Sequence, residues 1–181
     1  MREFREKVVA PALRHLQPIP SELVGGPKAY LTDVARDNSH NALCYEMRLS
    51  FALTIGAAFE RNLRLWLSLG RDELRREIER ANRPTLFKLV AEVKGTKAGS
   101  LIQVTAVCEL WELVSSARHG DGLAAKRLKA LNPELWSHQD TETQAVYDRM
   151  GLRAYSLRVK DTDLERYFDA TIGFWDSASR G

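Results

Sequence analysis

An apolar residue recurs at every fourth position between Leu43 and Leu67, and this spacing places the set on one face of a single long α-helix. The members are Leu43, Met47, Phe51, Ile55, Phe59, Leu63 and Leu67. Gly70 follows as a natural stop. The sequence therefore predicts a helix from about Asn41 to Ser68 that must bury its apolar face against other helices.

A second, more buried helix is expected over residues 100–118, where Ser100 is placed to cap its first turn. This stretch is apolar nearly all round, yet its polar residues share one helical face. They are Thr105, Glu109, Glu112, Ser116 and His119. Buried polar groups are unfavourable without partners, so this line is the leading candidate for a functional site.

Shorter elements complete the prediction. Residues 2–16 form an amphipathic helix, and residues 17–30 form a loop that contains three prolines and two glycines. Further helices are expected over residues 71–81, 84–94 and 123–131.

The C-terminal part begins with an apolar alternation at Tyr155, Leu157 and Val159 that is too short to make a sheet. A capping box over residues 162–165 then opens the last helix. Its inner side is expected to carry Leu164, Phe168, Ile172 and Trp175.

These elements predict an all-α fold, an antiparallel helical bundle with two long central helices and shorter flanking ones. With 181 residues the chain is expected to form one domain, residues 1–181. Residues 1–40 supply an N-terminal helix and loop, and residues 41–178 supply the core bundle.

Composition is that of an ordinary soluble protein, 44% hydrophobic and 28% charged. No apolar run reaches the ~20 residues that span a bilayer, so we expect a cytoplasmic protein with no membrane partner. Cys44 and Cys108 fall in predicted buried helices and are interpreted as core thiols in a reducing compartment. All four tryptophans fall on apolar faces or helix ends and are assigned to packing.

Charge gives a weaker indication of partners. The net charge is +3, too small by itself to indicate a nucleic-acid protein. Arginines including Arg61 and Arg64 are candidate binding residues, but neighbouring glutamates favour a solvated face with ion pairs. Glu60 lies off the polar line of its helix, as a partly buried carboxylate that needs a partner.

The segment Arg118-His119-Gly120-Asp121-Gly122 ends the buried helix, and two interpretations stay open. The first is structural: cations favour a helix C-terminus, and Gly120 ends the helix in the left-handed conformation. The second is an acid–base site, in which Glu112, Ser116 and His119 converge near the helix end.

No known ligand motif decides between these interpretations. No histidine pair has zinc-ligand spacing, and no P-loop or Rossmann glycine pattern is present, so we expect neither a metal nor a cofactor. Gly120-Asp121-Gly122 precedes a helix and offers backbone N–H groups to a phosphate, although a tight connection is the simpler role.

The stretch VSSARHGDGLAAKRLKALNPELW, followed by DLERYFDATIGFWD, resembles the HEPN superfamily (higher eukaryote and prokaryote nucleotide-binding domains) over residues 41–178. The resemblance implies a bacterial defence or toxin–antitoxin system. Many members are metal-independent, dimeric RNases with an arginine and a histidine separated by four to six residues. Here Arg118 directly precedes His119, and Arg36 and His40 have three residues between them.

Two functions follow as expectations. In the first, the chain is a non-catalytic or degenerate binding module, with Glu112, Ser116 and His119 in a structural network. In the second, it is an RNase in which His119 is the general acid or base, Arg118 stabilises the phosphate, and Glu112 or Asp121 orients the imidazole. Expected partners are a second copy, RNA or a nucleotide, and a partner protein from the same operon.

Overall fold

The computed structural model describes residues 1–20, 23–24, 31–69, 71, 74–94, 104–137, 145, 149 and 156–179. Every regular element within these ranges is helical, so the predicted all-α class is confirmed. In chain order the elements are α1 (Arg2–Phe4), a π-helical turn (Arg5–Val9), α2 (Ala10–His15), α3 (Leu31–Ser68), α4 (Arg75–Arg80), α5 (Arg83–Lys94), α6 (Val104–His119), α7 (Leu123–Leu131), a 3₁₀ turn (Pro133–Trp136) and α9 (Asp161–Ser179).

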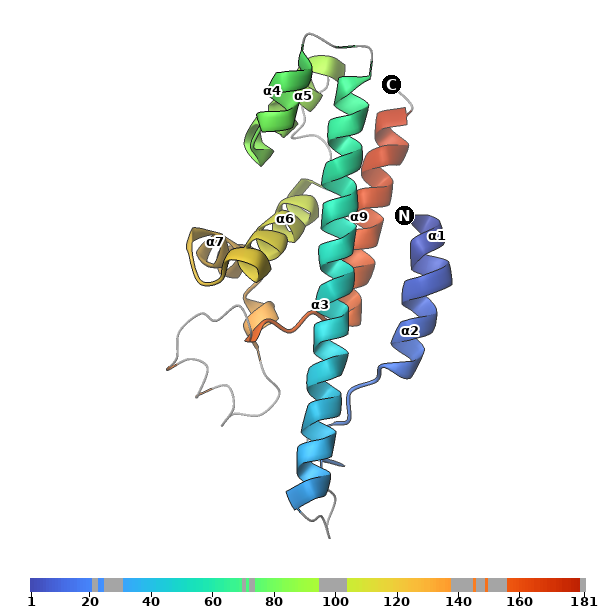
Figure 1. Cartoon of the computed structure of the whole chain (residues 1–181), viewed down its shortest axis with the longest axis vertical. Helices are drawn as coiled ribbons and strands as arrows, with labels where there is room; N and C mark the ends of the chain where they lie inside the picture. Colours follow the sequence, from blue (N-terminus) through green and yellow to red (C-terminus); the bar gives the residue numbers. More distant parts are fainter. Residues whose placement is uncertain are drawn as a thin grey trace.

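Helix α3 forms the spine of the molecule, with α9 beside it (Figure 1). Arg48 near the middle of α3 pairs with Asp161 at the start of α9, and Trp66 near the end of α3 contacts Trp175 near the end of α9. The two longest described helices therefore run in the same direction. The antiparallel arrangement predicted from short connections does not extend to this pair.

The N-terminal helical segment, α1 to α2, runs antiparallel to both α3 and α9. Near the start of this segment, Arg2 forms an ion pair with Asp176 near the end of α9. Just after its end, the Leu16 carbonyl accepts a hydrogen bond from Arg48 of α3. A π-helical turn interrupts it before Pro11, which has no N–H to donate to the preceding turn. The predicted helix over residues 2–16 is confirmed.

Helix α3 begins at Leu31, ten residues before the predicted start at Asn41. The prediction was wrong because residues 31–40 are mostly polar and carry no apolar face. No proline or glycine interrupts them, so the helix continues in the N-terminal direction. Asn41 holds the preceding loop against this helix: its side chain exchanges two hydrogen bonds with the backbone of Ile19, at 2.7 and 2.9 Å.

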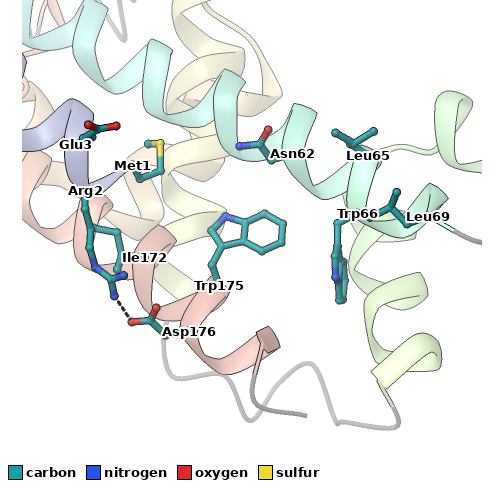
Figure 2. Close-up of a pocket in the computed structure, with 10 residues that line it drawn as sticks. All are labelled: Met1, Arg2, Glu3, Asn62, Leu65, Trp66, Leu69, Ile172, Trp175 and Asp176. Atoms are coloured by element: carbon teal, nitrogen blue, oxygen red, sulfur yellow. Dashed lines mark hydrogen bonds and ion pairs between the residues drawn. The ribbon is translucent and has the colours of Figure 1, made fainter.

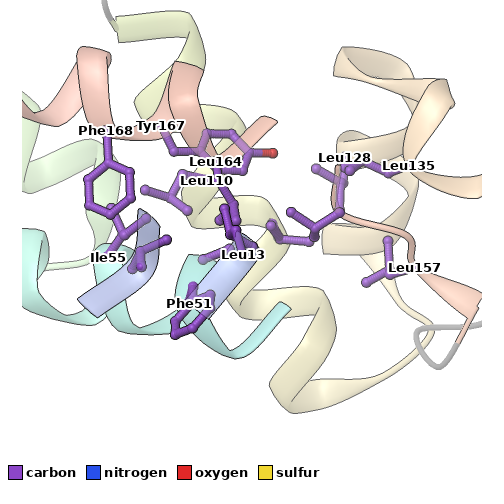
Figure 3. Packing of buried hydrophobic residues seen from close by; sticks show 14 of the residues in the cluster. Leu13, Phe51, Ile55, Leu110, Leu128, Leu135, Leu157, Leu164, Tyr167 and Phe168 are labelled. Carbon is purple, nitrogen blue, oxygen red and sulfur yellow. The ribbon is translucent and has the colours of Figure 1, made fainter. Parts of the chain in front are cut away.

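The core lies between α3, α6 and α9 in two apolar clusters. One joins the middle of α3 to α6, α7, α9 and the N-terminal segment, with Phe51, Ile55, Leu110 and Phe168 at its centre (Figure 3). The other surrounds Phe59, which contacts Trp111, Phe174 and Trp175 at ring-centroid distances of 5.1–5.9 Å. Buried apolar area of this extent is the main source of stability for a helical domain.

Several helix ends follow local rules. Asn82 caps α5, because its Oδ1 accepts the Thr85 N–H at 3.0 Å, and Pro84 occupies the first turn as predicted. Helix α9 begins before the predicted capping box: the side chain that reaches back is Asp163, whose Oδ2 accepts the Lys160 N–H at 3.0 Å.

The inner face of α9 is broader than predicted. Leu164 and Phe168 are buried, whereas Ile172 and Trp175 are only half-buried, and Tyr167, Thr171 and Phe174 join the core. The short apolar alternation before α9 stays irregular: Leu157 and Val159 are buried, and Tyr155 lies outside the described residues.

One helix within the described ranges, Asp33–Ser68 of α3, is long and apolar enough to cross a membrane by length and composition alone. The core helix of a soluble protein meets the same criterion. In this structure the apolar face of α3 packs against α6 and α9. Arg48 of α3 is also buried, and it forms an ion pair with Asp161.

Candidate functional site

The polar line of α6 is divided among different environments. Thr105 and His119 are exposed, Glu112 is half-buried, and Glu109 and Ser116 are buried. The line does not open onto one cleft, because α6 packs against α3, α7 and α9 at once. Each polar residue therefore has its own neighbours.

Glu109 is the centre of a buried hydrogen-bond network. Arg166 of α9 binds its carboxylate through both terminal nitrogens, at 2.5 and 2.6 Å. The Tyr167 hydroxyl donates to Oε1 at 2.6 Å, and Nδ2 of Asn132 donates to the same oxygen at 3.0 Å. Asp163 completes the network by accepting from Arg166 and Asn132.

Electrostatics hold this network in one charge state. Burial alone raises the pKa of Glu109, but the hydrogen bonds from Arg166, Tyr167 and Asn132 outweigh it, so the pKa lies below its usual value. Burial, followed by the charge of Glu109, raises the pKa of the Tyr167 hydroxyl. Glu109 is therefore an ionised acceptor and Tyr167 a neutral donor at neutral pH.

The partners of Glu109 were missed in the sequence because they come from α9 and from the residue that ends α7. The network borders a polar cavity of about 330 Å³ that Lys160, Thr162 and Glu134 also line. Every charged member of the network is already paired. The network links α6, α7 and α9, so its geometry supports a structural role.

Glu112 is engaged by α7. Its two carboxylate oxygens accept from Nε and Nη2 of Arg127, at 2.9 and 3.0 Å. No hydrogen bond joins Glu112 to His119 within the described residues. Glu112 therefore does not orient the imidazole in this structure.

The end of α6 has the geometry predicted for a helix terminus. Gly120 adopts a left-handed φ of 75°, and its N–H donates to the Ser116 carbonyl at 2.9 Å. Gly122 caps α7 with extended backbone and no side-chain hydrogen bond, and Asp121 between the glycines is exposed. The predicted C-terminal glycine conformation is confirmed.

Two buried polar atoms lack hydrogen-bond partners within the described part of the chain, the Oγ of Ser116 and the indole Nε1 of Trp111. Both lie on α6.

Cys108 on the same helix is half-buried and has its thiol pKa raised by burial and by the charge of Glu112. A raised pKa disfavours the thiolate, so Cys108 is a poor nucleophile.

A basic cleft lies between α3 and α6. It has a volume of about 280 Å³ and is lined by Ala57, Glu60, Arg61, Arg64, Val114 and Arg118. Three of the predicted site residues, Arg61, Arg64 and Arg118, thus come together from two helices. We refer to this cavity as the arginine cleft.

Gly56 explains why the cleft forms there. A Cβ on Gly56 would lie 2.6 Å from Cγ2 of Val114, so only glycine allows α3 and α6 to approach so closely. The axes of α3 and α6 are inclined to each other (Figure 1). The arginine cleft lies beside this contact, because Ala57, the neighbour of Gly56, and Val114 both line it.

Glu60 is the one acid among the described residues that lines the arginine cleft, and it has the cationic partners that the sequence required. Its Oε1 accepts from Nη2 of Arg64 at 2.8 Å, and its Oε2 lies 3.7 Å from Nε of Arg83. The prediction of a partly buried, paired carboxylate is confirmed. Its partners shield its negative charge from a ligand in the cleft.

Arg64 and Arg83 hold neighbouring elements. Arg64 uses its remaining donors on the carbonyls of Ile78, Glu79 and Ala81 at the end of α4. Arg83 donates to the Trp111 carbonyl and stacks over the Trp111 ring at 5.7 Å. Burial lowers the pKa of Arg83, and the positive charge of Arg118 contributes to the same shift.

Arg61 and Arg118 differ from these two arginines. Both side chains are exposed, and neither makes a hydrogen bond or an ion pair with any residue in the described ranges. They face the arginine cleft from α3 and from α6. The predicted solvated face with ion pairs is thus realised in part, at Arg64 and at Arg75 with Glu79, but not at Arg61.

Another cavity is a different surface, an apolar groove of about 610 Å³ between α1, the end of α3 and the end of α9 (Figure 2). Its apolar lining includes Trp66, Trp175 and Ile172 and two exposed leucines, Leu65 and Leu69. The charged groups at its edge are paired, Arg2 with Asp176 and Glu3 with Lys7. Its lining offers apolar contact and no unpaired acid or base among the described residues.

Metal ligands do not gather in the described ranges: no group of three or more histidine, cysteine, aspartate or glutamate side chains is placed to hold an ion there. No protein-family model, curated protein or solved structure matches this chain, so its function must be inferred from its own residues.

Proposed function

We propose that this protein is a non-catalytic, HEPN-like binding module of a bacterial defence or toxin–antitoxin type system, and that it binds RNA through the arginine cleft. The observation that carries the proposal is the pair of unengaged guanidinium groups, Arg61 and Arg118, that face one cavity from two helices. Guanidinium groups match the geometry of phosphate oxygens and remain charged at neutral pH.

The surroundings of His119 favour binding over cleavage. RNA cleavage without a metal requires a positioned acid and base near the ribose and the phosphate. His119 is exposed and has no hydrogen-bond partner in the described part of the chain, and it does not line the arginine cleft. Glu112, the predicted orienting carboxylate, is held by Arg127. The exposure of His119 and the pairing of Glu112 with Arg127 therefore support RNA binding over RNA cleavage.

The proposal is tested with the purified full chain and a fluorescent single-stranded RNA of about 20 nucleotides. We expect binding that weakens as the salt concentration rises, because phosphate contacts release counterions. Total RNA should remain intact with wild type and with His119→Ala alike. Arg118→Ala should weaken binding, and His119→Ala should leave it nearly unchanged.

Two results would overturn the proposal. If no RNA binds even at low salt, the cleft is not an RNA-binding site. If wild type degrades RNA and His119→Ala does not, the protein is an RNase, and the catalytic alternative replaces the binding module.

A further inference from the structure

The arginine cleft is small, about 280 Å³, and lies between two packed contacts of the chain. At one end α3 and α6 touch at Gly56 and Val114. Towards the other end Arg64 is bonded to the last carbonyls of α4. A cavity of this volume has room for one small charged group, whereas a longer nucleic-acid strand would extend beyond it.

The charge of the cleft also selects its ligand. Three arginines line the cavity, Arg61, Arg64 and Arg118, and Arg83 lies beside Glu60, its one lining carboxylate in the described part of the chain. Glu60 is already shared by Arg64 and Arg83. The excess positive charge suits a doubly charged group better than the single charge of a phosphodiester or a carboxylate.

The donors that remain define how such a group is held. The N–H groups of Arg64 are spent on Glu60 and on the α4 carbonyls, so Arg64 supplies charge and position. Arg61 and Arg118 are exposed and keep their donor edges available. One guanidinium fork from each helix can therefore bind a different pair of oxygens on the same phosphate.

We infer that the arginine cleft binds a terminal phosphate, a phosphomonoester held between Arg61 and Arg118. The inference rests on the proposed function and deepens it, since it states which part of an RNA the cleft recognises. The same chemistry is present in a phosphorylated RNA end, in a nucleoside monophosphate and in inorganic phosphate. Ala57 and Val114 are the apolar residues that line the cavity.

The test compares one RNA sequence in three forms, with a 5′-phosphate, with a 3′-phosphate and with hydroxyl groups at both ends. Binding is measured by fluorescence anisotropy on the full chain at fixed salt. We expect one phosphorylated form to bind at least tenfold more tightly than the hydroxyl form, in keeping with charge-assisted hydrogen bonds from two arginines. Competition with adenosine monophosphate and with inorganic phosphate separates an RNA-end site from a free-phosphate site.

Variants locate the preference. Arg61→Gln and Arg118→Gln should each remove the preference for the phosphorylated form, and both side chains are exposed, so the melting temperature should stay close to that of wild type. Arg14→Gln is the matched control, because Arg14 is an exposed arginine of α2, on the other side of α3 (Figure 1). This control should keep the full preference.

The outcomes separate the two proposals. Equal affinity for phosphorylated and hydroxyl forms would overturn the terminal-phosphate site while leaving RNA binding intact. A preference that survives both cleft variants would place the phosphate elsewhere and overturn it as well. Absence of RNA binding together with tight inorganic phosphate binding that Arg61→Gln abolishes would overturn the proposed function and retain the phosphate site.

Discussion

At the scale of single residues, the most constrained group is Glu109. A buried carboxylate is strongly unfavourable unless charge and hydrogen bonds compensate it, and here Arg166, Tyr167 and Asn132 supply both. Glu112, three residues further along α6, makes a more exposed pair with Arg127. Glu109 and Glu112 carry the same carboxylate group but differ in burial. Replacing each one should therefore lower the free energy of unfolding by a different amount.

We expect Glu109→Gln to lower the free energy of unfolding by about 2 kcal/mol, less than the ~3–5 kcal/mol of a fully buried pair because Arg166 is partly exposed. Glu112→Gln should lower it by less than ~1 kcal/mol, since 59% of the Arg127 side chain is exposed. Urea unfolding of both variants at pH 7 measures the difference. Equal losses would show that burial does not set the strength of these pairs.

The same residue predicts a pH dependence. The pKa of Glu109 is lower in the folded protein than in the unfolded chain, so its stabilisation is fully present above the unfolded value of ~4.3. The stabilisation is lost as the pH falls below that value through the folded pKa. The stability gap between wild type and Glu109→Gln should therefore be wide at pH 7 and narrow towards pH 3. Urea titrations across this range check it, and a constant gap would contradict the assignment.

At the scale of elements, the contact between α3 and α6 depends on the absence of a side chain at Gly56. Gly56→Ala places a Cβ 2.6 Å from Val114, a stiff β-branched side chain in a helix, so the helices must separate. Alanine favours helix over glycine by ~1 kcal/mol, but overpacking costs about 1–3 kcal/mol. We expect a net destabilisation of about 1 kcal/mol, measured by urea unfolding.

A paired substitution provides the control for that prediction. Val114→Ala removes the methyl group that Gly56→Ala would meet, so the double variant should recover part of the stability that the two single variants lose separately. Strictly additive losses in the double-mutant cycle would show that the two positions are not in contact.

At the scale of the whole molecule, the N-terminal segment is attached mainly by apolar contact. Phe4 packs between Phe51 and Phe168, with ring centroids 6.4 and 6.1 Å away. Arg5 adds ion pairs to Glu165 and Asp169, whose side chains are 51% and 69% exposed. Exposed ion pairs contribute little in water, whereas a large half-buried aromatic side chain contributes more.

Phe4→Ala should therefore release residues 2–15 more than Arg5→Gln does. We expect a loss of about 2 kcal/mol for Phe4→Ala and less than ~1 kcal/mol for Arg5→Gln. Hydrogen–deuterium exchange of the N-terminal segment measures this local opening. Faster exchange in Arg5→Gln than in Phe4→Ala would reverse the order and show that the ion pairs hold the segment.

Local sequence determined which segments are helical. Four-residue apolar spacing, Pro84, Gly120 and Asn132-Pro133 act within one or two turns, so the helices over residues 84–94 and 123–131 and the end of α6 could be predicted. The start of α3 could not, because residues 31–40 have no apolar face to signal a helix. The need of Glu60 for a cationic partner could be read from its position on the helix.

The identity of partners was decided only by tertiary structure. Arg166 and Tyr167 reach Glu109 across more than fifty residues of sequence, and Arg83 reaches Glu60 from another helix. Short connections constrain only consecutive helices, so they carry no information on the parallel packing of α3 and α9. Helical periodicity tells which face of a segment is buried, and docking of whole helices decides which side chains meet there. The arginine cleft is one result of that docking, since its lining residues come from α3 and α6 beside their contact at Gly56.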